Sequence, residues 1–221
     1  MARSPELIDV MAATTGEAKE SVSVALSRLR KSNLVPVGGR GPYAIAMDNR
    51  SAVRLLIAVC GAVPLETDSA SMAVRRFEAL PLSRATLEHN GADKDLKSLL
   101  MPLDHLPRDH TSGMALMQMV EAGGKEELFS FADRRNGIRQ KGFRQSQIRG
   151  FVRISFLLPI PQVRIEHQLA AWLRKSWVYG SPIDPDRYNT ACREAGLGDR
   201  SRVSTITETT IEEIGRVLLR P

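Results

Sequence analysis

The sequence is poor in aromatic residues, in cysteine and in long apolar stretches. Aromatic side chains make up 5% of the 221 residues, which argues against a protein specialised for carbohydrates or aromatic ligands. No run of about 18 apolar residues is present, so we expect no membrane-spanning segment. The start of the chain has no apolar signal segment, and Cys60 and Cys192 lie far apart. We therefore expect a cytoplasmic protein whose two thiols are buried rather than functional.

The motifs of the common enzyme classes are also missing. There is no Walker loop, no dinucleotide-binding fingerprint and no nucleophile elbow, and the glycines within 38–41 lack a following Lys and Ser or Thr. None of the four histidines has a Cys or His partner at metal-ligand spacing. His105 and His110 lie near Asp104 and Asp109, but such groups in an acidic loop are usually surface residues. We therefore predict no catalytic residue, no metal and no cofactor.

Residues 7–31 carry two helical patterns separated by a glycine. Ala12 and Gly16 are four positions apart. They supply a small residue where two helices touch and a residue that tolerates positive φ at the turn. The residues after the turn place an apolar stripe at i, i+3, i+4 and i+7 of a second helix: Val22, Ala25, Leu26 and Leu29. We expect this stripe to pack on three residues of the first helix, Leu7, Ile8 and Met11.

The opposite face of the second helix is polar. It carries Lys19, Glu20, Ser23, Ser27, Arg28, Arg30 and Lys31. Short hydroxyls and guanidinium groups can hydrogen-bond to base edges and phosphates. The apolar runs 34–37 and 43–46 flank a glycine-rich turn, which predicts a hairpin with Arg40 at its tip.

This pattern resembles the winged helix-turn-helix DNA-binding domains of bacterial and phage-type transcription regulators. The resemblance covers roughly residues 5–60. Glu17 stands where the family usually has an apolar residue, and the helix that normally precedes the pair is expected to be missing. Apolar residues at helical spacing over 49–63 are expected to supply a substitute third helix. The resemblance implies that the second helix contacts duplex DNA and that the wing touches the backbone or the minor groove.

The net charge of +6 is unevenly distributed. Residues 1–60 hold 8 basic and 5 acidic side chains, and residues 134–175 hold 10 basic and 1 acidic. Residues 61–133 are acidic, with 7 basic and 12 acidic side chains. Two separated basic regions favour an extended polyanion as partner. The predicted DNA-binding residues are Lys19, Ser23, Ser27, Arg28, Lys31 and Arg40, with Arg135, Arg139, Lys141 and Arg144 as a second group.

The remainder of the chain predicts an α+β fold. We expect helices over 72–79, 112–122, 126–133, 168–177 and 186–195 and from residue 210 onward. We expect strands over 151–158, 162–167 and 203–207, of which the first two form a hairpin or two edge strands around Pro159 and Pro161. Residues 83–110 are expected to be irregular. The predicted organisation is a DNA-binding domain over 1–63, followed by an acidic helical region over 64–133 and a basic, mixed region over 134–221 that together form a second domain.

The sequence therefore favours a sequence-specific regulator that binds double-stranded DNA. A homodimer is expected because one such helix reads only a few base pairs. Two alternatives stay open. One is a DNA-packaging or assembly protein, such as a phage terminase small subunit, and the other is a winged-helix adaptor that binds protein.

Overall fold

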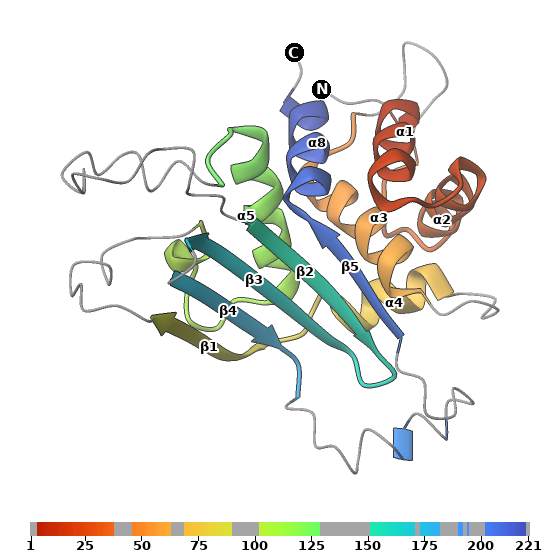
Figure 1. The fold of residues 1–221 in the computed structure, drawn as a ribbon. Helices are drawn as coiled ribbons and strands as arrows, with labels where there is room; N and C mark the ends of the chain where they lie inside the picture. Colours follow the sequence, from red (N-terminus) through yellow and green to blue (C-terminus); the bar gives the residue numbers. More distant parts are fainter. Residues whose placement is uncertain are drawn as a thin grey trace.

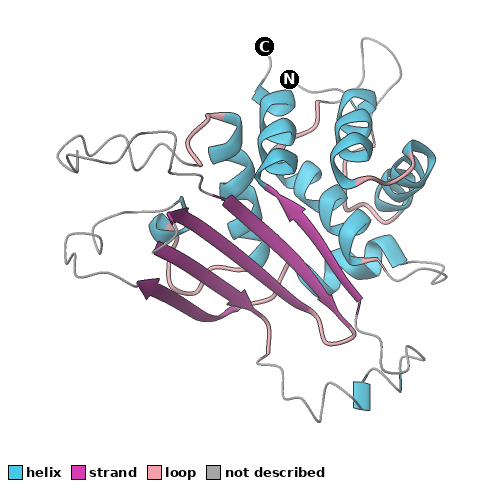
Figure 2. Ribbon diagram, in the orientation of Figure 1, coloured by secondary structure: helices cyan, strands magenta, loops and turns pink. Residues whose placement is uncertain are grey.

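The computed structural model is a mixed α+β structure (Figure 2). The described residues are 4–37, 46–62, 69–89, 102–128, 151–170, 173–181 and 202–219, with the isolated positions 190, 191 and 194. The helices are α1 (Ser4–Thr15), α2 (Lys19–Lys31), α3 (Asn49–Gly61), α4 (Ser69–Phe77), the 3-10 helix η3 (Pro102–His105), α5 (Ser112–Gly124) and α8 (Glu208–Leu219). The strands are β1 (Leu82–His89), β2 (Phe151–Leu158), β3 (Gln162–Ala170), β4 (Leu173–Tyr179) and β5 (Arg202–Thr207).

The described strands form one five-stranded sheet in the order β1-β4-β3-β2-β5. Every neighbouring pair is antiparallel. Strands β2 and β3 are joined by the turn that contains Pro159 and Pro161, which confirms the hairpin. The alternative of two edge strands is wrong, because both strands have a neighbour on each side. Ile154 of β2 lies opposite Ile165 of β3 and Ile206 of β5, so apolar side chains continue across three strands.

The helices cover one face of this sheet. On β2, Val152, Ile154 and Phe156 are buried and the intervening Arg153 is exposed. Because successive side chains point to opposite faces, only one face meets the core. Helices α3 and α8 contact both β2 and β5, and Figure 1 shows the strands passing in front of α5. The described part of the chain is therefore a helical layer on one side of an antiparallel sheet.

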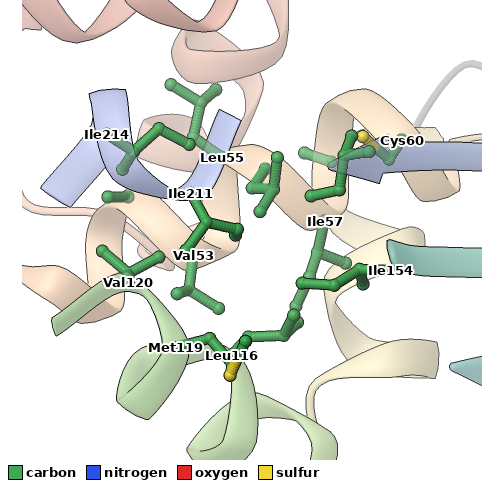
Figure 3. Packing of buried hydrophobic residues seen from close by; sticks show 14 of the residues in the cluster. Val53, Leu55, Ile57, Cys60, Leu116, Met119, Val120, Ile154, Ile211 and Ile214 are labelled. Carbon is green, nitrogen blue, oxygen red and sulfur yellow. The ribbon is translucent and has the colours of Figure 1, made fainter. Parts of the chain in front are cut away.

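Helix α3 lies in the middle of the hydrophobic core. Its Leu55 and Ile57 are completely buried. Figure 3 shows these side chains among Leu116 of α5, Ile211 of α8 and Ile154 of β2. The core thus joins helices from the N-terminal part of the chain to the sheet and to the last described helix.

Helices α5 and α8 approach each other through glycines. A Cβ placed on Gly215 would lie 2.3 Å from the backbone nitrogen of Gly124 and 2.4 Å from the carbonyl oxygen of Val120. A Cβ placed on Gly124 would lie 2.6 Å from the carbonyl oxygen of Gly215. Both positions therefore require glycine because the two backbones are in contact.

Helices α1 and α8 pack side by side (Figure 1). The Oγ1 hydroxyl of Thr210 donates a hydrogen bond of 3.3 Å to the carbonyl oxygen of Thr14. The first and last described helices thus belong to one packed layer. The domain boundary predicted at residue 63, and the division of the remaining domain at residue 133, stay predictions.

Several predicted elements are confirmed. The helices expected over 49–63, over 112–122 and from residue 210 are α3, α5 and α8. The helix expected over 72–79 is α4, which begins and ends a few residues earlier, and the strand expected over 203–207 is β5. Helix α3 begins at Asn49 because the Asp48 carboxylate accepts a hydrogen bond of 2.7 Å from the backbone nitrogen of Ser51.

Two predictions are wrong. The region 83–110, expected to be irregular, contains strand β1. The helix expected over 168–177 is instead the end of β3 followed by β4. Strand β4 is paired on both sides, and Trp177 lies opposite Ile165 of β3 and Ala85 of β1. Hydrogen bonding to two neighbouring strands, which local sequence does not reveal, outweighs the helical spacing of its apolar residues.

Two further helix predictions have different outcomes. The helix expected over 126–133 is absent at residues 126–128, where Glu126 adopts a φ of 57° two residues after the end of α5. The remainder of that range lies outside the described residues. The helix expected over 186–195 also lies outside them, apart from positions 190, 191 and 194.

Candidate nucleic-acid interface

The turn between α1 and α2 has the geometry that its sequence predicts. Gly16 adopts a φ of 76°, a conformation that residues with a side chain rarely take. Its backbone nitrogen donates a hydrogen bond of 3.0 Å to the carbonyl oxygen of Ala12, which is 7% exposed. A glycine that reverses the chain and a small residue at the helix contact therefore bring the two helices together.

The predicted apolar stripe of α2 faces the core. Val22, Leu26 and Leu29 are buried, and Ala25 is half-buried against them. Helix α2 contacts both α1 and α3. Helix α3 thus completes the three-helix group that was expected from residues 49–63, and the opposite face of α2 faces solvent.

The outer face of α2 carries the predicted contact residues. Lys19, Ser23, Ser27 and Lys31 are exposed, and Arg28 is half-buried. The predicted DNA-contacting residues of this helix therefore lie together on one accessible surface.

Lys19 differs from the others because it already has an anionic partner. Its Nζ lies 2.9 Å from Oδ1 of Asp9 on α1, and both side chains are more than half exposed. An exposed ion pair contributes only about 0–1 kcal/mol, so a phosphate can displace Asp9 at small cost. The N-terminal half of the face is nevertheless less cationic than its sequence alone indicates.

Two residues at the centre of this face are missing from the sequence-based selection. Glu20 and Val24 precede Ser27 and Lys31 in a row spaced i, i+4, i+7 and i+11, which is a single stripe on a helix. Val24 is 49% exposed despite its apolar side chain. Exposed apolar groups can contact the thymine methyl, and a carboxylate can accept from cytosine N4. The helical spacing of Val24 relative to Lys31 is the signal that could have identified it.

Arg30 has a structural role instead of an outward position. It is half-buried, and its Nη2 donates a hydrogen bond of 2.6 Å to the Ser4 hydroxyl at the start of α1. An open groove runs between the two helices, lined by Ile8 and Asp9 of α1 and by Lys19, Glu20, Ser23 and Val24 of α2.

The predicted wing is not confirmed. Residues 34–37, expected as its first strand, form no strand. Val35 is instead buried in the core, and the Leu34 carbonyl accepts a hydrogen bond from Arg54 of α3. Residues 38–45, which include Arg40, lie outside the described residues.

The second group of predicted DNA-contacting residues is not among the residues that the structure describes. Arg135, Arg139, Lys141 and Arg144 all lie outside the described residues. In the sequence they precede β2 directly, and β2 begins at Phe151.

A separate polar cluster lies under the sheet. The Lys175 ammonium is paired with the Asp104 carboxylate, and the buried His167 is close enough to interact electrostatically with both. Burial lowers the pKa of His167 to about 4, so the imidazole is neutral at pH 7. Among the described residues, no three His, Cys, Asp or Glu side chains gather where they could hold a metal ion.

The histidine that follows η3 is also built into the fold. His110 is buried, and its Nε2 shares a hydrogen bond of 2.8 Å with the Tyr179 hydroxyl. Its Nδ1 is bonded to the Pro107 carbonyl, which makes Nδ1 the protonated nitrogen and leaves Nε2 to accept from tyrosine. Burial raises the pKa of the Tyr179 hydroxyl, so it stays protonated as the donor.

Comparisons with models of protein families, with curated proteins and with solved structures found no match to this chain. None of the described helices is both long and apolar enough to cross a membrane. The function proposed below therefore rests on the geometry and charge of the chain itself.

Proposed function

We propose that this protein is a sequence-specific regulator that binds double-stranded DNA through the outer face of α2. The observation that carries the proposal is the α1–Gly16–α2 unit, whose second helix buries one stripe and exposes the opposite one. An α-helix with its side chains is about 10–12 Å across, and the major groove is about 12 Å wide. Helix α2 is therefore of the right size to enter it.

The side chains of this face suggest a division of roles. Ser23, Val24 and Ser27 are short and lie in the middle of the helix, where they can approach base edges. Arg28 and Lys31 lie in its last turn, where long cationic side chains can reach phosphates. The middle of α2 would supply sequence preference, and its C-terminal end would supply affinity.

A second copy of the chain is part of the proposal. One helix reads only a few base pairs, and a two-fold dimer on a palindromic site is the usual way to increase affinity and specificity. A regulator of this kind would act in the cytoplasm, where the DNA is.

The proposal is tested by selecting duplexes from a random library and measuring binding of the preferred duplex by fluorescence anisotropy at several salt concentrations. Ser27→Ala and Val24→Ala should each reduce the preference for the selected sequence by about 1–3 kcal/mol per lost base contact. Lys31→Ala should weaken binding to all duplexes and reduce the salt slope by about 1. Lys125→Ala, at the residue that follows α5, also removes one exposed cation; it is the matched control and should change neither.

Three results would reject this function. The intact protein could fail to bind any genomic duplex at low salt, as a protein-binding adaptor would. The α2 variants could bind as well as the unaltered protein. Light scattering could instead show a ring-sized oligomer without a defined footprint, which a packaging protein would give.

A further inference from the structure

The face of the sheet opposite the helical layer carries an uneven set of charges. Its described residues include four arginines and two glutamates: Arg84, Arg153, Arg164, Arg174, Glu88 and Glu166. The register places them on one face, because Glu166 lies opposite Arg153 and Arg174 lies opposite Glu88. Arg84 and Arg164 join the same face because each lies opposite Val178 on β4, which separates them. Positive charge is therefore in excess on this surface.

The two acids are already neutralised. Glu166 has a side chain only 8% exposed and is paired with Arg174, and its second carboxylate oxygen lies 3.9 Å from Arg153. Glu88 also lies 3.9 Å from Arg174. Both glutamates of this face are therefore paired with Arg153 or Arg174, and neither neutralises the charge of the other two arginines.

Arg84 and Arg164 are those remaining cations. Both are exposed, and within the described residues neither forms an ion pair. They stand two strand spacings apart, which is about 10 Å. In addition, residues 134–149 hold six basic and no acidic side chains and run directly into β2. In the sequence, the most basic segment of the chain is therefore followed by β2, a strand of this positively charged face.

The same face also offers flat and hydrogen-bonding groups. The Arg153 guanidinium carbon lies 5.4 Å from the centre of the Phe151 ring. The hydroxyls of Thr86 and Ser176 are bonded to each other across β1 and β4 at 2.6 Å. Aromatic rings and guanidinium planes are surfaces on which nucleic-acid bases stack, and hydroxyls hydrogen-bond to phosphates and bases.

The width of the face decides which nucleic acid it can accept. Five strands at about 4.8 Å spacing span about 19 Å, whereas the major groove of a duplex is about 12 Å wide and accepts a helix or a two-stranded ribbon. The face as a whole is therefore too wide to read a duplex, but a single strand can lie across it. A second copy of the chain is a poor occupant because a two-fold interface would place this excess positive charge against itself.

We propose that the open face of the sheet binds single-stranded nucleic acid, with Arg84 and Arg164 on phosphates and the Phe151–Arg153 pair stacked against a base. This surface is separate from the outer face of α2 and acts on a different form of nucleic acid. Either surface can fail without affecting the other.

The probe is a fluorescein-labelled 20-nucleotide oligothymidine, measured by anisotropy with the full chain in 50 mM and 200 mM NaCl. Arg84→Glu and Arg164→Glu should each weaken binding at least tenfold at the lower salt concentration, and Phe151→Leu should weaken it about fivefold. Arg75→Glu on α4 is the matched charge reversal in the helical layer and should change binding less than twofold. Arg164→Gln provides a milder substitution, and circular dichroism of each variant confirms that it is folded.

The two proposals are separated by the same set of variants. Lys31→Glu on α2 should impair duplex binding and leave the oligothymidine affinity within twofold. The sheet proposal is overturned if the unaltered protein does not bind oligothymidine at 50 mM NaCl. It is also overturned if Arg75→Glu weakens binding as much as Arg164→Glu. A third contrary result is that light scattering shows a dimer that Arg164→Glu dissociates, since the occupant of the face would then be a second copy.

Discussion

Alanine at position 215 would force two helices apart. Its Cβ would lie 2.3 Å from the Gly124 nitrogen and 2.4 Å from the Val120 carbonyl oxygen, whereas ordinary contacts begin at 3.4 Å. Both neighbours are backbone atoms, so α5 and α8 must separate by about 1 Å, which is enough to forfeit a quarter to a half of each dispersion contact along the seam. Overpacking of this kind costs about 1–3 kcal/mol, and the better helix propensity of alanine returns at most about 1 kcal/mol. We expect a net loss of about 1–2 kcal/mol for Gly215→Ala.

Urea unfolding followed by circular dichroism measures this loss. The transition midpoint should fall by about 0.5–1 M, because the dependence on urea is about 1–3 kcal/mol per M for small proteins. Thr209→Ala is the control, since it adds alanine to the exposed side of the same helix without entering the seam. A Gly215→Ala protein that unfolds at the same or a higher urea concentration than the unaltered protein would refute the proposed backbone contact.

Three further predictions concern stability. The pKa of His167 is about 4 in the folded protein and ordinarily about 6.5, so the unfolded chain binds a proton on this imidazole more tightly. The free energy of unfolding should therefore fall by about 3 kcal/mol between pH 6.5 and pH 4. Urea titrations of His167→Met should lack this part of the loss, and an unchanged pH profile would contradict it. Gly16→Ala should lower the free energy of unfolding by about 1 kcal/mol. Strain from the positive φ is the only cause, because the added Cβ would meet no other atom; a higher melting temperature would argue against strain. Asp48→Ala should cost about 1 kcal/mol in urea unfolding by removing the cap on Ser51, whereas Asp48→Asn should retain most of it; equal losses would exclude capping as the cause.

The parts of the fold that were predictable depend on short-range patterns. Gly16 and the α2 stripe that ends at Leu29 are local features, since a turn and a helix face are each encoded within about ten residues. The β2–β3 hairpin was equally accessible because its alternation and its prolines are adjacent in sequence.

The parts that could not be predicted depend on distant partners. Trp177 lies in a strand only because β1 and β3 flank it, and β1 comes from a region about ninety residues earlier. Val24 was overlooked for the opposite reason: an apolar residue in a helix is assumed to face the core, and only the packing of α2 shows that it faces solvent. At the candidate site, the sequence predicted helix α2 and its polar face. It did not show that Lys19 is paired with Asp9 or that Arg30 is hydrogen-bonded to Ser4.

The contact between α1 and α8 has a consequence for how the protein acquires its structure. The residues joined by the Thr210–Thr14 hydrogen bond are 196 positions apart. Closing a loop of that length costs roughly 5 kcal/mol of chain entropy, and proteins rich in such distant contacts fold slowly. During synthesis, α1 and α2 leave the ribosome long before α8, which packs against α1, has been made. Helices α1 and α2 of a nascent chain therefore lack the support of α8 until residues 208–219 have been synthesised.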